Sequence, residues 1–272
     1  ESPIEKEVTV HPFEHMGSIT MIALISGILG AKIFHNLENW STFINDPIGE
    51  LTSFSGLTFY GGLIFGAIGV IWYARKKGIP PLHMLDVGGP TMMLAYCLGR
   101  MGCHMSGDGD WGIVNTNPKP DWLSWAPDWL WAYDYPNNVN NAGQLIEGCT
   151  GSNCYHLVPP VYPTPLYEIM MAGFLFFVLW KIRKKVTIPG VLFGIYLVLN
   201  GLERFFIEKI RVNTIVWELF GMDITQAEII SSTLILLGIA MVVVLHKMNK
   251  TGLPASWHKP ILEKNTIVDE EE

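Results

Sequence analysis

The sequence predicts an all-α polytopic membrane protein with about six transmembrane helices and an extracytoplasmic head loop. Apolar residues make up 49% of the 272 residues and charged residues only 16%, which is more apolar than an ordinary soluble domain. Six apolar runs are each long enough to form most of a membrane span, and basic clusters follow alternate runs. The sequence has no clustered basic face, so we expect no nucleic-acid partner.

The chain is expected to divide into five segments. A cytoplasmic segment (1–15) precedes transmembrane helices that carry a glycine-rich stretch (16–112), a head (113–165), further transmembrane helices (166–246) and a cytoplasmic tail (247–272). The spans within these segments are predicted at about 16–34, 57–73, 83–102, 166–180, 190–207 and 229–245.

The predicted head is too polar to cross a membrane, because it contains Asn-rich and Pro-rich runs. It is also rich in tryptophan, whereas disordered segments are poor in aromatic residues, so we expect an ordered cap that lies partly at the membrane interface. Cys149 and Cys154 lie close together in this segment. A disulfide between them is expected if the loop faces an oxidising compartment.

The basic clusters predict the orientation. Arg75-Lys76-Lys77 and the cluster from Lys181 to Lys185 each follow an even-numbered span. Cytoplasmic loops carry the excess of Lys and Arg, so both clusters are expected to face the cytoplasm. The head then faces outward, and both termini of this chain are cytoplasmic.

In this topology, polar side chains from five spans fall at one depth, near the outer leaflet. They are Lys32, Tyr60, Arg100, Tyr167, Glu168, Arg204 and Glu208. Ionisable groups within a membrane usually pair with one another or line a polar cavity. Two arginines suggest an anionic partner, because guanidinium binds phosphate in a bidentate way. A phosphate at this depth is most simply a phospholipid head group. A compatible alternative pairs Arg204 with Glu168 or Glu208.

The third span leads into a stretch from Gly99 to Gly112 that contains five glycines, a His, a Ser and two Asp. Arg100 stands at its start, at the edge of the apolar run. Glycines let the backbone approach a ligand closely or adopt positive φ. The simpler alternative is an arginine that snorkels from a helix end and is followed by a turn.

Six segments, in order, resemble the motifs of one bacterial family. They are Gly30-Ala31-Lys32, Asn45-Asp46-Pro47, Phe59-Tyr60-Gly61-Gly62-Leu63-Ile64, the stretch from Gly99 to Gly112, Tyr162-Pro163-Thr164-Pro165-Leu166-Tyr167-Glu168, and Arg204-Phe205-Phe206-Ile207-Glu208-Lys209-Ile210-Arg211. The chain thus resembles the prolipoprotein diacylglyceryl transferases, collinearly over about residues 17 to 246.

The chain departs from the family pattern at several places. Tyr60 stands where the family has a histidine, Cys103 where it has the first signature asparagine, and Ser106 near the second. One extra residue falls around Asp108-Gly109-Asp110. The family is expected to have seven spans, and the additional amino-terminal one is not contained in this sequence.

The resemblance implies a reaction in the bacterial inner membrane. The diacylglyceryl group of phosphatidylglycerol would pass to the lipobox cysteine thiol in a prolipoprotein signal peptide, with release of glycerol phosphate and without a cofactor or metal. Arg100 and Arg204 would bind the head-group phosphate and stabilise the leaving group. The general base is either Tyr60 or His104, and the resemblance does not decide between them. Tyrosine titrates near pH 10, whereas histidine titrates near neutrality, where a general base works best.

Other residues are expected to bind substrate. The glycines would offer backbone N–H groups to the head group, as in other anion-binding turns. Asp108 and Asp110 would fix that loop or accept hydrogen bonds from the glycerol hydroxyls. The full expected set is Gly99, Gly102, Cys103, Ser106, Gly107, Asp108, Gly112, Tyr167, Glu168, Glu208 and Lys32.

Two alternatives from other classes remain. An inactive homologue that serves as a structural membrane partner would account for Tyr60 in place of histidine. A polytopic transporter would spread its polar residues through the bilayer and show related halves, and the sequence shows neither feature clearly.

Overall fold

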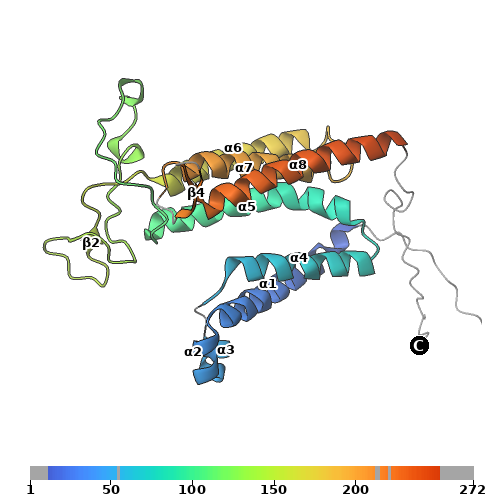
Figure 1. Ribbon diagram of the computed structural model, residues 1–272, viewed down its shortest axis with the longest axis horizontal. Helices are drawn as coiled ribbons and strands as arrows, with labels where there is room; N and C mark the ends of the chain where they lie inside the picture. Colours follow the sequence, from blue (N-terminus) through green and yellow to red (C-terminus); the bar gives the residue numbers. More distant parts are fainter. Residues whose placement is uncertain (1–11, 54–55, 212–214, 220–221, 252–272) are drawn as a thin grey trace, which may run out of the picture. The chain divides into compact units, whose positions relative to one another are not determined.

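The computed structural model describes residues 12–53, 56–211, 215–219 and 222–251, and these residues are mostly helical (Figure 1). The helices are α1 (Met16–Glu38), α2 (Trp40–Asn45), α3 (Pro47–Thr52), α4 (Phe59–Lys76), α5 (Pro81–Ser106), α6 (Thr164–Ile182), α7 (Val191–Glu208) and α8 (Gln226–Thr251). Short 3-10 helices are η1 (Pro12–His15), η2 (Asp121–Leu123) and η3 (Asp128–Leu130). The strands β1 (Gln144–Leu145) and β2 (Tyr155–His156) form one hairpin, and β3 (Ile215–Leu219) and β4 (Met222–Thr225) another.

Each of the six predicted spans coincides with a long helix. Within the described residues, three helices are long and apolar enough to cross a membrane: Met16–Glu38, Thr164–Ile182 and Gln226–Lys250. The helices α4, α5 and α7 are not among these three. The structure is therefore consistent with a helical membrane protein, and the number of six spans stays a prediction.

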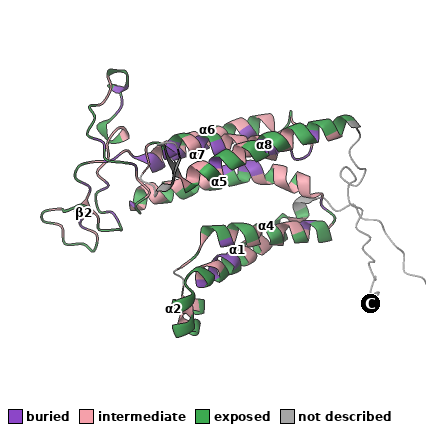
Figure 2. Ribbon diagram, in the orientation of Figure 1, coloured by how far each residue is buried: buried purple, intermediate pink, exposed green. Residues whose placement is uncertain are grey.

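Exposed side chains on the long helices are largely apolar. Figure 2 shows long exposed stretches on α1 and α8. On α1 these include Leu24, Ile28 and Leu29, and on α8 Leu236 and Leu237. A soluble protein rarely leaves so much contiguous apolar surface in water, whereas a bilayer accommodates it.

The chain forms two compact units that divide between residues 84 and 85. In the first unit, α1 packs against α4 through glycines at the crossing. A Cβ atom at Gly30 would lie 2.5 Å from the Gly61 carbonyl oxygen, and one at Gly61 would lie 2.4 Å from that of Gly30. Only glycine allows this backbone approach, which is typical of helix packing in membranes.

In the second unit, α5, α6 and α7 share a core of Met93, Ala172, Leu179, Leu192 and Tyr196. The Asp86 carboxylate of α5 accepts hydrogen bonds from the backbone N–H groups of Gly190 (2.7 Å) and Phe193 (2.9 Å) at the start of α7. A carboxylate is favourable there because the first amides of a helix lack intrahelical partners. This contact fixes α7 alongside α5.

The helix α5 continues further than predicted. It runs to Ser106, four residues beyond the predicted span 83–102, so Gly99 and Gly102 lie inside the helix and the predicted end of the helix is wrong. The turn begins at Gly107, which has φ +61°, followed by Gly109 with φ +100°. Arg and Met between the two glycines, and Cys and His after them, can all adopt a helical conformation. The helix therefore continues as far as the turn.

The segment between α5 and α6 is ordered although it contains little regular structure. In Figure 1 it extends beyond the ends of the helices of its unit as two lobes, one of which carries β2. A small core of Tyr135, Leu157 and Val161 lies at its base. Bridges pair Val161 with Val114 and with Tyr133, so the segments before, between and after the two lobes lie side by side.

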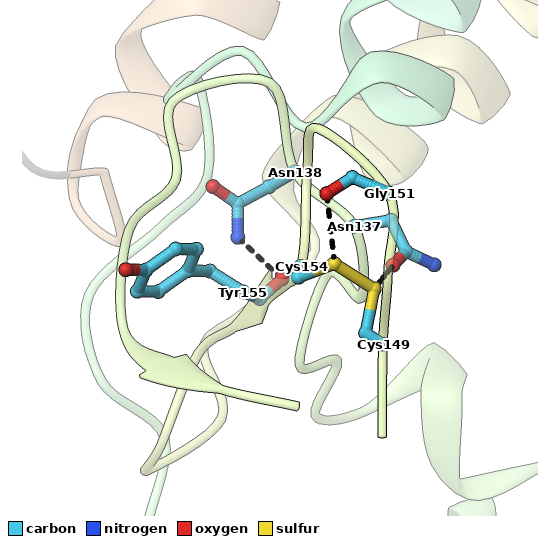
Figure 3. The surroundings of a disulfide bond; sticks show 6 residues. All are labelled: Asn137, Asn138, Cys149, Gly151, Cys154 and Tyr155. Carbon is cyan, nitrogen blue, oxygen red and sulfur yellow. Dashed lines mark hydrogen bonds between the residues drawn. A yellow bond between two sulfur atoms is a disulfide. The ribbon is translucent and has the colours of Figure 1, made fainter. Parts of the chain in front are cut away.

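The second lobe is closed by a disulfide between Cys149 and Cys154, whose pairing the sequence left open (Figure 3). Beside it, the buried Asn138 amide donates hydrogen bonds to the carbonyl oxygens of Ala142 and Tyr155, both at 3.0 Å. One side chain thus connects separate segments of irregular backbone. Its hydrogen bonds satisfy buried carbonyl groups that have no partner in a β-sheet.

Two predicted boundaries fall partly outside the described residues. The predicted cytoplasmic segment 1–15 is described from residue 12 onward, and the predicted tail 247–272 only to residue 251. The described part of the tail, 247–251, is the end of α8.

Candidate active site

The centre of the site is the carboxylate of Glu168, which has no exposed surface. It lies in the first turns of α6, directly after the Tyr162-Pro163-Thr164-Pro165 sequence that begins the helix. The Arg100 Nε atom of α5 lies 2.8 Å from its Oε2 atom. Guanidinium nitrogens of Arg204 (3.2 Å) and Arg211 (3.3 Å) contact its Oε1 atom. One buried carboxylate therefore gathers three arginines from different parts of the chain.

A second carboxylate, Asp110, lies in the turn after α5. One of its oxygens pairs with Arg100 and the other with Arg211. The Thr164 hydroxyl donates a hydrogen bond to the Asp110 carbonyl oxygen at 2.9 Å. Asp110 and Glu168 thus hold Arg100 and Arg211 from two sides, which fixes both guanidinium groups.

Gly112 brings the chain back to the end of α7. It forms a bridge with Arg211, and a Cβ atom at this position would lie 2.5 Å from the Ile210 carbonyl oxygen. The next residue, Ile113, donates a backbone hydrogen bond to that same oxygen at 2.9 Å. A side chain at Gly112 would separate these segments, so the glycine serves backbone packing here.

Two further carboxylates of α7 border the cluster. Glu208 pairs with Arg204 at 3.4 Å, one helical turn apart, which confirms the expected pairing of Arg204 with both Glu168 and Glu208. Glu203 is only 5% exposed, and its Oε1 atom has no hydrogen-bond partner among the described residues. Buried carboxylates beside fixed guanidinium groups are typical of functional sites in membrane helices.

The arginines of the site keep hydrogen-bond donors for an anion although their charges are already balanced. Three arginines face the three carboxylates paired with them, Glu168, Asp110 and Glu208, and the bordering Glu203 lies outside these ion pairs. Each guanidinium carries five N–H donors in a fixed fork, more than these pairs use. The arginine side chains are 11% to 24% exposed, which leaves part of each open to an incoming anion.

The pKa of the Asp110 carboxyl lies below its ordinary range. Burial raises this pKa, but the neighbouring guanidinium groups of Arg100 and Arg211 lower it by more. The folded pKa is therefore below the unfolded value of about 4. The ionised carboxylate contributes stability above that value, and the contribution is lost as the pH falls through the folded pKa.

An Asp110→Asn variant tests this linkage. We expect it to unfold more easily than the parent protein by about 1–3 kcal/mol near neutral pH, because hydrogen bonds to charged groups are lost. The difference should shrink as the pH falls from about 4 through the folded pKa, below which the parent carboxylate is protonated and has lost its charge. Thermal unfolding in detergent micelles over a pH series measures it. A difference that stays constant into strong acid would contradict the assignment.

His104 lies on α5 but contacts the segment after it. Its Nδ1 atom is 3.2 Å from the Tyr135 hydroxyl, and its ring packs against those of Tyr133 and Tyr135. Burial raises the pKa of Tyr135, so that hydroxyl keeps its proton at neutral pH. In the tautomer that carries its hydrogen on Nδ1, the ring donates this hydrogen bond to the Tyr135 oxygen, and Nε2 is then unprotonated and able to accept a proton.

Lys32 and Tyr60 belong to the first unit. The buried Lys32 ammonium donates hydrogen bonds to the Ser53 carbonyl oxygen (3.1 Å) and hydroxyl (2.8 Å). Tyr60 lies in the first turn of α4, half-exposed, with its ring against that of Phe59.

The remaining predicted substrate-binding residues have structural contacts. The Cys103 sulfur lies 3.9 Å from an Arg100 nitrogen. Ser106 donates its hydroxyl hydrogen bond to Gly102 of its own helix at 2.9 Å, and Tyr167 donates its own to the Leu130 carbonyl oxygen at 2.7 Å. A role for them in substrate binding stays a prediction.

The turn also places three potential metal ligands together. Atoms of Cys103, Asp108 and Asp110 lie within 4.8 Å of one another. Asp110 already pairs both oxygens with guanidinium groups, and Asp108 accepts a hydrogen bond from the Asp110 backbone N–H at 3.3 Å. We therefore interpret Cys103, Asp108 and Asp110 as residues that hold the arginines in place.

Sequence reasoning did not assign Arg211 to the site, and it did not foresee that Asp110 pairs with the arginines. Arg211 follows Arg204 and Glu208 at spacings of seven and three residues. Residues at i, i+4 and i+7 share one face of a helix, so this spacing was the available signal. No such periodicity exists for Asp110, because it lies in a turn whose path depends on the rest of the structure.

The comparisons with known proteins agree with the motifs. The family model described as prolipoprotein diacylglyceryl transferase matches residues 3–244. The chain is 28% identical over 227 residues to the phosphatidylglycerol–prolipoprotein diacylglyceryl transferase of Streptococcus pyogenes serotype M5 (strain Manfredo), covering 82% of this chain and 76% of the relative. The relatives from serotypes M49 (strain NZ131) and M1 are similar to the same extent.

Proposed function

The chain belongs to the prolipoprotein diacylglyceryl transferase family, and from this membership we propose that it transfers the diacylglyceryl group of phosphatidylglycerol to a prolipoprotein cysteine. The observation that supports the proposal best is the convergence of three arginines on Glu168 and Asp110. Such a cluster suits a phosphate that must be held and then released as a leaving group.

The proposed step forms one bond and breaks one. The thiol of the lipobox cysteine loses its proton to a base, and its sulfur bonds to the glycerol carbon that carries the phosphate. The carbon–oxygen bond to phosphate breaks, its electron pair goes to the phosphate oxygen, and glycerol phosphate leaves. Arg100, Arg204 and Arg211 stabilise the charge that grows on that oxygen.

The proton acceptor is one of two candidates. His104 would donate a hydrogen bond from Nδ1–H to the Tyr135 oxygen and accept the proton on Nε2. Tyr60, in place of the family's histidine, could act as a base only after losing its own proton, and could instead donate a hydrogen bond. Substitution of each residue distinguishes the two.

The family and the apolar helices make the chain a membrane protein of the bacterial inner membrane. We propose that α1 and α4–α8 all span the bilayer, with the segment between α5 and α6 outside and the termini of this chain in the cytoplasm. The basic clusters after α4 and α6 support this orientation. The arginine cluster would then lie near the outer leaflet.

Transfer in proteoliposomes tests the function. The full chain would be supplied with phosphatidylglycerol and a lipobox peptide, and the mass gain on the peptide cysteine would be measured. We expect transfer by the parent protein and its loss in Arg204→Ala and Arg211→Ala. Lys209→Ala is the matched control, because this exposed side chain pairs with Glu228 away from Glu168.

The same assay separates the alternatives. Loss of transfer in His104→Ala but not in Tyr60→Phe would assign the base to His104, and the reverse would assign a role to Tyr60. If the folded parent protein transferred nothing from any of several anionic lipids, the enzyme assignment would be overturned in favour of an inactive homologue or a transporter.

A further inference from the structure

The segment before α6 contains a tandem repeat. Pro120-Asp121-Trp122-Leu123-Ser124-Trp125-Ala126 is followed directly by Pro127-Asp128-Trp129-Leu130-Trp131-Ala132. The two copies form the same local structure, η2 and η3, each entered from a proline with extended ψ. We call residues 117–132 the tryptophan lobe.

One side of the tryptophan lobe is held inside the protein. Leu123 and Ala126 are buried, and the Lys119 ammonium donates to the Ala126 carbonyl oxygen and pairs with Asp128, both at 2.7 Å. The Trp131 indole donates to the Asn117 carbonyl oxygen at 3.0 Å. These contacts give the tryptophan lobe a defined conformation.

The other side carries three tryptophans in solvent. The exposed fractions are 74% for Trp122, 78% for Trp125 and 49% for Trp129. Tryptophan is large and apolar with one polar N–H, and it usually buries most of its surface. Three such side chains are exposed within eight residues of one short lobe, which indicates a partner.

The lobe is attached to the end of a membrane-span candidate. The Tyr167 hydroxyl, in the first turns of α6, donates to the Leu130 carbonyl oxygen at 2.7 Å. The Asn115 amide donates to the Trp131 carbonyl oxygen at 2.7 Å. In Figure 1 the lobe between α5 and β2 projects sideways from the ends of the helices of its unit. It is thus fixed at the depth where α6 would leave a bilayer.

We propose that Trp122, Trp125 and Trp129 insert into the lipid interface beside α6, so that the partner of the tryptophan lobe is the bilayer itself. Tryptophan is enriched at this depth because its ring is amphipathic. Lys119 pairs with Asp128, so that one negative charge, that of Asp121, is left on the lobe. The inference goes beyond the transfer reaction and depends only on α6 crossing the membrane. Tyr167, which bonds to the tryptophan lobe, is the neighbour of Glu168 in α6. The lobe and the arginine cluster are therefore attached to the same helical turn.

Quenching by brominated lipids tests the anchor. The full chain and a W122F/W125F/W129F variant would be reconstituted in vesicles with bromine near the top or near the end of the acyl chain. The difference between their emission spectra reports these three tryptophans. We expect blue-shifted emission that shallow bromine quenches more strongly than deep bromine. Emission as in water, without quenching, would overturn the proposal.

Two controls keep the result specific. Trp131→Phe removes the internally bonded indole of the same repeat and should leave the lipid quenching unchanged. The single variants W122F and W125F repeat the measurement if the triple variant misfolds. If a blue shift appeared only on addition of lipobox peptide, without lipid quenching, the patch would be a surface for the precursor, and the proposal would be wrong.

Discussion

Replacing Glu168 with alanine is expected to abolish transfer and to destabilise the second unit by about 3–5 kcal/mol, the cost of removing one partner from a buried ion pair. The carboxylate has no exposed surface and contacts three guanidinium groups. Without it, Asp110 and Glu208 alone would face three partly buried cations. Unfolding in detergent micelles and the proteoliposome assay measure the two effects.

The conservative variant separates charge from shape. Glu168→Gln keeps the volume and one carbonyl acceptor, so we expect it to fold better than the alanine variant while still losing most transfer. Glu147→Ala, at an exposed position, is the matched control for loss of a glutamate and should behave as the parent protein. Parent-like activity in Glu168→Gln would show that the arginines do not need this charge.

Replacing Arg100 with lysine is expected to lower transfer by about 10²–10³-fold, the usual cost of removing one preorganised donor to a developing oxyanion. Lysine keeps the positive charge but lacks the planar guanidinium group with its fixed N–H donors. Arg100 contacts Glu168 through Nε and Asp110 through a terminal nitrogen at once. A single ammonium cannot reproduce both contacts and still face a phosphate.

The kinetic parameters distinguish the roles of Arg100. If the side chain acts on the leaving group, kcat falls more than KM rises, because the lost interaction is made in the transition state. A rise in KM alone would assign Arg100 to lipid binding only. Lys209→Arg, the reverse exchange at an exposed position, should leave both parameters unchanged.

Local patterns in the sequence were sufficient for the helices. Each predicted span is a helix because apolar runs of this length satisfy their backbone hydrogen bonds within the segment, and α5 does so even with Pro90 in its interior. The motifs likewise identified the family, since six short segments in order depend on residue identity and not on distance in space. The end of α5 was mispredicted because glycines favour turns but do not forbid a helix.

Which carboxylate neutralises which arginine was decided only by the tertiary structure. The sequence offered Glu168 and Glu208 as partners for Arg204, and the fold uses both. It also adds Arg100 and Arg211 to Glu168, with Asp110 bridging the same two arginines. These pairs depend on how α5, α6 and α7 are rotated about their axes. That rotation is set by core packing, by the Asp86 contact and by close approach at Gly112, which no local window of sequence contains.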